Sequence, residues 1–224
     1  MTTAHATDTG PAAVDRESLA AFLLRMRAAG IDDKALLKAI EAVPRREFAD
    51  PQFHDAVWSS RMIPIDCGET IEGLDHQARV LAELALDENQ RVLEIGTGSG
   101  YTAAVMGKLT RRVYSIERFR RLRAAAQARL RALKIDNVIV SHGDGLAGSD
   151  EGPFDRIVVW PALTSVPRGF TELLVSGGKL ICAIGEADER QVLVRLTKVG
   201  SRYEREDIGT VRAQLVVAGL PEAL

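Results

Sequence analysis

Apolar residues in the first part of the chain recur at the three- and four-residue spacing of amphipathic helices. Leu19, Phe22 and Met26 fall on one face of a helix that is expected to begin at Asp15. The same pattern predicts helices over about 15–29, 32–43 and 74–86. Residues 44–73, between the second and third helices, are irregular and contain several prolines and glycines. A stretch that long inside a compact domain is often functional.

Beyond residue 90 the pattern changes to short apolar runs that alternate with helical segments. Strands are expected over 91–95, 112–116, 137–141, 154–160 and 179–184, with helices over 101–109, 118–133 and 167–174 between them. This alternation implies a parallel sheet with helices on both faces. Three further runs, over 191–198, 202–208 and 211–217, are expected to add antiparallel strands. The predicted fold is α/β: a doubly wound, mostly parallel sheet of the seven-stranded type with antiparallel C-terminal strands and an N-terminal helical cap.

The length of 224 residues fits one domain. We expect this domain to span 15–224, with a helical cap and an irregular loop over 15–86 and the sheet over 87–224. Residues 1–14 are small and polar and are expected to form a disordered tail.

Charge and cysteine content argue against several classes of protein. Lys and Arg number 29 against 31 Asp and Glu, and a net charge of −2 is unlike that of a chain whose main task is to neutralise nucleic-acid phosphates. Two cysteines cannot form a disulfide framework or a four-cysteine zinc site, and the isolated histidines predict no metal site. The N-terminus has no features of a secretory signal, and no apolar run has the length of a membrane span. A cytoplasmic protein is therefore expected, and the sequence does not indicate its oligomeric state.

The strongest chemical signal follows the strand over 91–95. Gly96, Gly98 and Gly100 have the spacing G-x-G-x-G, and Glu94 precedes them within the strand. Glycines at this place allow a tight turn from strand to helix and a close approach of the backbone to a ligand. A carboxylate before the loop suits a cationic ligand group better than a pyrophosphate, and the loop lacks a P-loop lysine. An NAD-linked oxidoreductase or a nucleoside-triphosphate site therefore fits poorly.

Two more acids end the strands that follow. Glu117 comes directly after the strand over 112–116, where a carboxylate can accept hydrogen bonds from ribose hydroxyls. Asp144 follows the strand over 137–141 and can accept from an adenine amino group, although an Asp-Gly pair is most often just a turn. The carboxyl ends of parallel strands meet at one crevice, so Glu94, Glu117 and Asp144 are expected to line a single ligand site.

This combination of loop and acids resembles the class I S-adenosylmethionine-dependent methyltransferases over about 90–220. The resemblance implies a Rossmann-like methyltransferase fold and S-adenosyl-L-methionine as the cofactor. It would place Glu94 near the amino-acid part of the cofactor, in an electrostatic role. The residues that it assigns to cofactor binding are Glu94, Gly96, Thr97, Gly98, Ser99, Gly100, Glu117, Asp144 and Gly145.

Within that class the chain is similar to the protein-L-isoaspartate O-methyltransferase family from about residue 34 onward. The similarity is carried by segments 43–48, 64–65, 68–71, 92–101, 115–118 and 143–145. It implies methyl transfer to the carboxylate of L-isoaspartyl residues in a protein or peptide substrate, which starts the repair of these residues. Thr70 and Glu72 are then the candidates for catalytic positions, and Ile71, Trp160 and Arg212 are expected on the substrate side.

Three departures from the family pattern lie on the substrate side. Glu72 stands where the family usually has a serine, whose hydroxyl lies by the methyl-transfer site. Residues 160–162 read Trp-Pro-Ala in place of the usual Thr-Ala-Ala. Residues 211–215 keep only the Arg and the Leu of the usual Arg-Phe-Val-Pro-Leu. The cofactor side of the pattern is intact.

An ionised Glu72 would change the chemistry if it faced the methyl donor. A carboxylate acceptor is already ionised at pH 7 and needs no general base, so the enzyme's task is alignment and exclusion of water. Two carboxylates about 4 Å apart repel by up to about 4 kcal/mol at an effective dielectric of 20. We therefore hypothesise that Glu72 favours a different acceptor, either as a general base for a hydroxyl or amine or as the partner of a cation. A Glu72→Ser variant with no gain in isoaspartyl methylation would count against this hypothesis.

Two other readings of the substrate side remain open. Glu72 can instead turn to solvent or cap the helix that begins near residue 74. The chain can also be a homologue that binds S-adenosylmethionine with little catalysis, and turnover to S-adenosylhomocysteine separates that reading from the methyltransferases.

Arginines crowd one predicted strand and the helix after it. A nucleic-acid surface is conceivable there, but Phe119 is the single aromatic residue in the predicted helix 118–133, which leaves little support for base stacking. A solvated helix is the favoured interpretation, so nucleic acid is not an expected partner. The arginines are Arg111, Arg112, Arg118, Arg120, Arg121, Arg123, Arg129 and Arg131.

Overall fold

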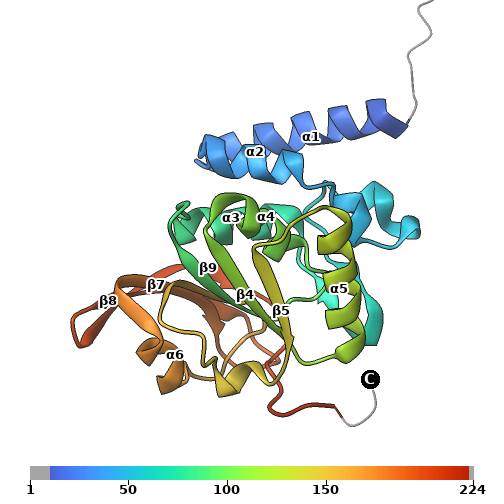
Figure 1. Ribbon diagram of the computed structural model, residues 1–224. Coiled ribbons are helices and arrows are strands. Elements are labelled where there is room, and N and C mark those ends of the chain that lie inside the picture. Colours follow the sequence, from blue (N-terminus) through green and yellow to red (C-terminus); the bar gives the residue numbers. More distant parts are fainter. Residues whose placement is uncertain (1–10, 222–224) are drawn as a thin grey trace, which may run out of the picture.

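The computed structural model of the protein describes residues 11–221 and contains a seven-stranded sheet with helices on both faces (Figure 1). The strand order is β5-β4-β3-β6-β7-β8-β9. Pairing is parallel from β5 to β7 and antiparallel from β7 to β9, which confirms the predicted fold class. The strands are β3 (Arg91–Ile95), β4 (Arg112–Glu117), β5 (Val138–His142), β6 (Phe154–Val159), β7 (Leu174–Ile184), β8 (Gln191–Val199) and β9 (Arg202–Val211).

The two faces of the sheet carry separate apolar clusters, because neighbouring residues in a strand point to opposite faces. In β3, Val92 joins the cluster that contains Phe22 and Ile40 of the N-terminal helices. Leu93, the next residue, joins the other cluster together with Phe154 and Phe170. All six side chains are fully buried, so β3 is covered on both sides, as expected for the centre of a doubly wound sheet.

Six α-helices surround the sheet in the described part of the chain. The first two form an outer layer over α3 and α4 (Figure 1) and pack on them, which makes the predicted helical cap. The second helix starts where Asp33 accepts hydrogen bonds from the backbone N–H groups of Ala35 and Leu36, at 2.9 and 3.1 Å. The helices are α1 (Pro11–Ala28), α2 (Lys34–Ala42), α3 (Leu74–Leu84), α4 (Tyr101–Leu109), α5 (Arg120–Ala132) and α6 (Arg168–Glu172).

Helix α1 starts at Pro11, earlier than the predicted start at Asp15. The predicted disordered tail, 1–14, therefore overlaps the first turn of this helix. Residues 1–10, the rest of that predicted tail, lie outside the described residues.

The loop over 44–73 has more structure than its irregular sequence indicates. It contains three short 3₁₀ helices and two short strands that pair antiparallel. Phe48 joins the apolar cluster on one face of the sheet and so anchors the loop, whereas Val57 and Ile63 form a small separate cluster with Ala49 and Ile71. The elements are η1 (Arg45–Phe48), η2 (Pro51–Ala56), β1 (Ile63–Pro64), η3 (Asp66–Gly68) and β2 (Thr70–Ile71); a further 3₁₀ turn, η4 (Gly145–Ala147), follows β5.

The predicted last strand over 211–217 is wrong. Strand β9 ends at Val211, and the chain then crosses the carboxyl end of β6 instead of adding to the sheet edge. Ala162 donates its N–H to the carbonyl of Gln214 and accepts from the N–H of Val216, both at 2.8 Å. The apolar residues of this segment therefore reflect contact with residues after β6 and not a place in the sheet.

Gly100 fixes the junction between the glycine loop and α4. Its φ is +89°, a conformation in which other residues are strained, and a Cβ here would lie 2.9 Å from the Cβ of Ala126 on α5. Gly30, after α1, has a similar φ of +78° but no atom within 4 Å of such a Cβ.

Replacing Gly100 with Ala should therefore destabilise the protein more than replacing Gly30 with Ala. Both changes carry the backbone strain of about 1–2 kcal/mol, and Gly100→Ala adds the overlap with Ala126. Thermal unfolding should show a loss of roughly 2–8 °C for Gly30→Ala and a clearly larger loss for Gly100→Ala. Equal losses in the two variants would show that the close approach of α5 to the loop contributes nothing.

Candidate functional site

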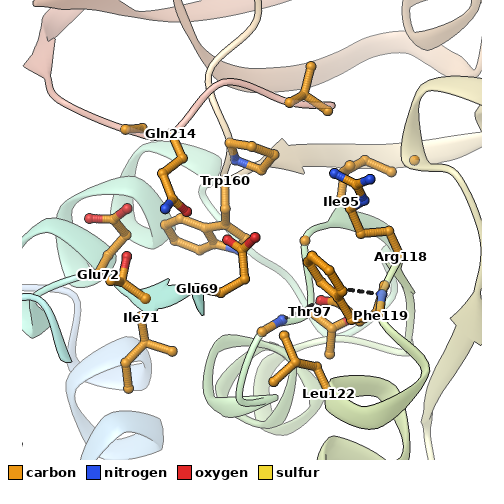
Figure 2. A pocket seen from close by; sticks show the side chains of 18 of the residues that line it. Glu69, Ile71, Glu72, Ile95, Thr97, Arg118, Phe119, Leu122, Trp160 and Gln214 are labelled. Carbon is orange, nitrogen blue, oxygen red and sulfur yellow. Dashed lines mark hydrogen bonds between the residues drawn. The ribbon is translucent and has the colours of Figure 1, made fainter. Parts of the chain in front are cut away.

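A cavity of about 630 Å³ opens at the carboxyl end of the parallel strands. Its wall is formed by the glycine loop after β3, the end of β4, the β2 loop, Trp160 and the segment after β9. Glu72 and Gln214 lie toward one end, Arg118 and Phe119 toward the other, with Trp160 between them (Figure 2). Volumes of about 300–1,000 Å³ are typical of small-molecule and cofactor sites.

The glycine loop brings backbone to the cavity wall. Gly96, Thr97, Gly98 and Ser99 line the cavity, whereas Gly100 lies behind the loop against α5. Gly96 and Gly98 have φ values of +90° and +54°, so the turn depends on residues without a Cβ. The loop therefore presents main-chain groups to any ligand in the cavity.

Glu117 holds this loop in place. Its Oε2 accepts a hydrogen bond of 2.8 Å from the N–H of Gly98, and its Oε1 accepts one of 3.0 Å from the N–H of Phe119. Burial raises the pKa of Glu117, and the backbone N–H groups around it act in the opposite direction. An ionised carboxylate has about four acceptor positions, so Glu117 keeps acceptor capacity for a ligand hydroxyl.

Glu94 lies behind the cavity wall instead of in it. The side chain is fully buried and accepts hydrogen bonds from the hydroxyls of Thr102 and Ser115, both at 2.6 Å. A third hydrogen bond, of 2.9 Å, comes from the indole N–H of Trp160. Burial raises the pKa of Glu94 to about 7 despite these donors. Glu94 thus orients Trp160, which does line the cavity.

The third predicted acid, Asp144, is occupied by backbone contacts. One carboxylate oxygen accepts from the N–H of Leu146 at 2.9 Å and caps η4, and the other accepts from the N–H of Gly219 at 2.7 Å. Its neighbour Gly145 lines the cavity. Of the three acids expected to line one site, the structure brings Glu117 to the cavity wall.

The two candidates for catalytic positions and the three predicted substrate-side residues all line the same cavity: Thr70 and Glu72, and Ile71, Trp160 and Arg212. The Glu72 carboxylate has no hydrogen bond or ion pair with any described residue, and burial alone raises its pKa to about 7. The idea that Glu72 caps the next helix is wrong, because Gly73 is the N-cap of α3 and this end has no side-chain cap.

Arg45 holds the backbone of Glu72 from inside the protein. Its guanidinium donates a 2.7 Å hydrogen bond to the Glu72 carbonyl, a second to Gln77, and stacks over the Tyr101 ring at 4.5 Å. The side chain is 1% exposed, and burial lowers the pKa of this arginine. The β2 loop is therefore fixed from the core while the Glu72 carboxylate faces the cavity.

Several residues of the site have no signal in the sequence. Gln191, fully buried on β8, holds the segment after β9: its Oε1 accepts from the N–H of Ala213 at 3.0 Å, and its Nε2 donates to the Ala213 carbonyl at 3.3 Å. Arg129 of the arginine-rich helix donates to the carbonyl of Ser99 at 3.1 Å and so supports the glycine loop. Glu69 and Met62 also line the cavity. Such contacts depend on segments that are far apart in the chain.

The cavity fits S-adenosylmethionine by the chemistry of its residues. The glycine loop would carry the cofactor's amino-acid part on backbone groups, Glu117 has acceptor positions for hydroxyls, and Phe119 and Leu122 give an apolar wall for a base.

No group of three or more His, Cys, Asp or Glu side chains that could hold a metal ion occurs in the described part of the chain. Within residues 11–221, no helix has both the length and the apolar character of a membrane span.

The comparisons with known proteins point to one family. A family model described as protein-L-isoaspartate(D-aspartate) O-methyltransferase matches residues 17–216. A protein-L-isoaspartate O-methyltransferase of Rhizobium meliloti (strain 1021) is 47% identical over 186 residues, which are 83% of this chain and 91% of that one. One from Rhodopseudomonas palustris (strain BisB5) is 43% identical over 204 residues, covering 91% and 94%.

A solved structure agrees with these relatives. It is described as a protein-L-isoaspartate O-methyltransferase (beta-aspartate methyltransferase) from Plasmodium falciparum in complex with S-adenosyl-L-homocysteine. The TM-score is 0.77 at 25% identity, and the match covers 88% of this chain and 97% of that one. The similarity therefore extends over the cap, the loop and the sheet.

Replacing Gln191 with Leu should loosen the wall of the cavity that follows β9. The change removes two hydrogen bonds to Ala213, each contributing about 0.5–1.5 kcal/mol. Amide hydrogen exchange over 213–216 should become roughly 5- to 100-fold faster, with the β8–β9 hairpin unchanged. Gln90→Leu is the matched control, since the Gln90 amide accepts from the N–H of Asp87 away from the cavity. Unchanged exchange over 213–216 would contradict the role assigned to Gln191.

Proposed function

The chain belongs to the protein-L-isoaspartate(D-aspartate) O-methyltransferase family, and we propose that it methylates the carboxylate of L-isoaspartyl residues in proteins or peptides. The methyl donor is S-adenosyl-L-methionine. One observation carries the proposal: a single cavity joins the glycine loop and Glu117 to the β2 loop, Trp160 and Arg212.

The cofactor supplies a methyl group activated by a sulfonium charge. On the protein side, the backbone of Gly96–Ser99 would bind the amino-acid part of the cofactor, and Glu117 would accept from the ribose hydroxyls. Gly145, Phe119 and Leu122 would surround the base. Glu94 would act indirectly, by orienting Trp160 and α4.

The acceptor side is supported by the loop and by the segment after β9. An ionised acceptor carboxylate needs no base, so Thr70, Ile71 and Trp160 would align it and exclude water. Arg212 supplies a positive charge on this side for an anionic acceptor. Met62 and Val217 line the mouth and are 54% and 55% exposed, which suits the apolar part of a peptide.

The proposal also divides these roles along the chain. Residues 15–86 would provide the cap and the acceptor loop, and 87–224 the cofactor-binding sheet, within one domain. A cytoplasmic location remains the expectation for an enzyme that repairs intracellular proteins.

A second candidate function follows from Glu72. The carboxylate lines the cavity without a partner, so it can serve as a general base for a hydroxyl or amine acceptor. A base-stable methyl group on the product would favour this candidate, whereas a base-labile methyl ester favours the carboxylate acceptor. Binding of the cofactor without turnover on any acceptor would identify a homologue with little catalysis.

Mass spectrometry after incubation with S-adenosylmethionine and an isoaspartyl peptide tests the proposal, with the matched normal-aspartyl peptide as control. A methyl ester should form on the isoaspartyl peptide alone.

Glu117→Ala should reduce cofactor affinity by roughly 10-fold or more, since charge-assisted hydrogen bonds contribute about 1.5–3 kcal/mol each. Glu88→Ala, at an exposed site, should leave it unchanged. Cofactor binding with no ester on the isoaspartyl peptide would contradict the proposed acceptor.

A further inference from the structure

The carboxylate of Glu72 lines the cavity and has neither a hydrogen bond nor an ion pair within residues 11–221. Glu117 accepts from two backbone N–H groups, and Glu94 accepts from three side chains behind the wall. The Glu72 carboxylate makes no such contact within residues 11–221, although its backbone carbonyl is bound by Arg45. Its polar atoms are therefore left for whatever enters this end of the cavity.

The charged groups around Glu72 do not stabilise its ionised form. Arg45 bonds the Glu72 carbonyl and Gln77, and burial alone accounts for the raised pKa of the Glu72 carboxyl, about 7. On α3, burial lowers the pKa of His76 to about 4, so this ring is neutral at pH 7. The other charged groups that line the cavity are Glu69, Glu117, Arg118 and Arg212.

Glu69 and Glu117 add negative charge to the cavity that Glu72 lines, although burial alone raises the pKa of Glu72 itself. Burial raises the pKa of Glu69, and the charge of Glu117 adds to that rise while Arg118 opposes it. An incoming acceptor carboxylate would bring one more negative charge to the same cavity. Like charges close together favour the uptake of a proton by one of them.

We propose that Glu72 binds the isoaspartyl acceptor in its carboxylic-acid form and donates a hydrogen bond to one oxygen of the acceptor carboxylate. This rests on the proposed function. The protonated group removes the repulsion expected from two carboxylates, and O–H···O⁻ hydrogen bonds are among the short, strong ones. Glu72 would thereby select an anionic acceptor, in place of the serine that is usual in the family.

Glu72 keeps its proton throughout the methyl transfer. The acceptor oxygen that is free of Glu72 supplies the electron pair of the new O–C bond, and the pair of the broken C–S bond stays on sulfur. The products are the methyl ester and S-adenosylhomocysteine, and the proton remains on Glu72. Its contribution is therefore to binding and alignment, so KM is the parameter expected to respond.

Binding of the acceptor should be linked to proton uptake. Calorimetry with an isoaspartyl peptide and S-adenosylhomocysteine, in buffers of different ionisation enthalpy near pH 7.5, should show uptake of a large fraction of a proton by the wild-type protein. Glu72→Gln keeps a donor of the same shape and has no proton to gain, so its uptake should fall to near zero. Glu88→Gln, at an exposed site that does not line the cavity, should keep the wild-type uptake.

Kinetics give an independent readout. The KM of the wild-type enzyme for the isoaspartyl peptide should rise by up to about tenfold per pH unit above pH 7, as Glu72 loses its proton more readily. Glu72→Gln should flatten this rise and should match the wild type within about threefold at pH 6. Glu72→Ser should flatten it as well.

The possible results distinguish the role proposed for Glu72 from the proposed isoaspartyl acceptor. An unchanged pH dependence of KM in Glu72→Gln, or unchanged proton uptake, would overturn the role of Glu72 while leaving isoaspartyl methylation intact. Activity that rises with pH and disappears in Glu72→Gln would overturn it in favour of a general base. If neither protein binds or methylates the isoaspartyl peptide at any pH while both bind the cofactor, the proposed acceptor itself is wrong.

Discussion

The fully buried carboxylate of Glu94 links the elements on which the cavity depends. It receives hydrogen bonds from α4 through Thr102, from β4 through Ser115 and from the chain after β6 through Trp160. A carboxyl group in the interior is costly unless it is hydrogen-bonded, so each donor is needed and each is fixed in return. The indole of Trp160, held in this way, becomes a rigid wall between the two ends of the cavity (Figure 2).

The two ends of the cavity are built by different physical means. At the cofactor end, glycines at positive φ turn the backbone inward, and Glu117 and Arg129 hold the loop at Gly98 and Ser99. At the acceptor end, buried Arg45 and Gln191 hold backbone groups of the β2 loop and of the segment after β9. In both cases the supporting side chains are fixed behind the wall, so ligand-facing groups such as Glu72 need no structural contacts of their own.

The sequence was sufficient for the fold because local signals agree with it. The period of the apolar residues distinguished helices from strands, and the G-x-G-x-G run located the turn after β3. The last predicted strand failed because apolar residues at 211–217 pack against residues after β6, a contact that no local pattern reports.

A site residue could be predicted from the sequence where its position at the end of a strand directs its side chain into the cavity. Glu117 is the last residue of β4 and reaches the cavity, whereas Glu94 lies within β3, where the pleat directs it to a face of the sheet. Asp144 begins a turn, and its carboxylate is used by nearby backbone N–H groups, as short acidic side chains often are. Arg45 and Gln191 could not be foreseen, since their partners are 27 and 22 residues away in the chain.

A crystal structure with S-adenosyl-L-homocysteine and an isoaspartyl peptide tests the central claim most directly. The account predicts the cofactor product along Gly96–Ser99 with its ribose hydroxyls on Glu117, and the isoaspartyl carboxylate within hydrogen-bond distance of Glu72. Cofactor product bound away from the glycine loop, or an isoaspartyl carboxylate that approaches the sulfur atom without contacting Glu72, would contradict it.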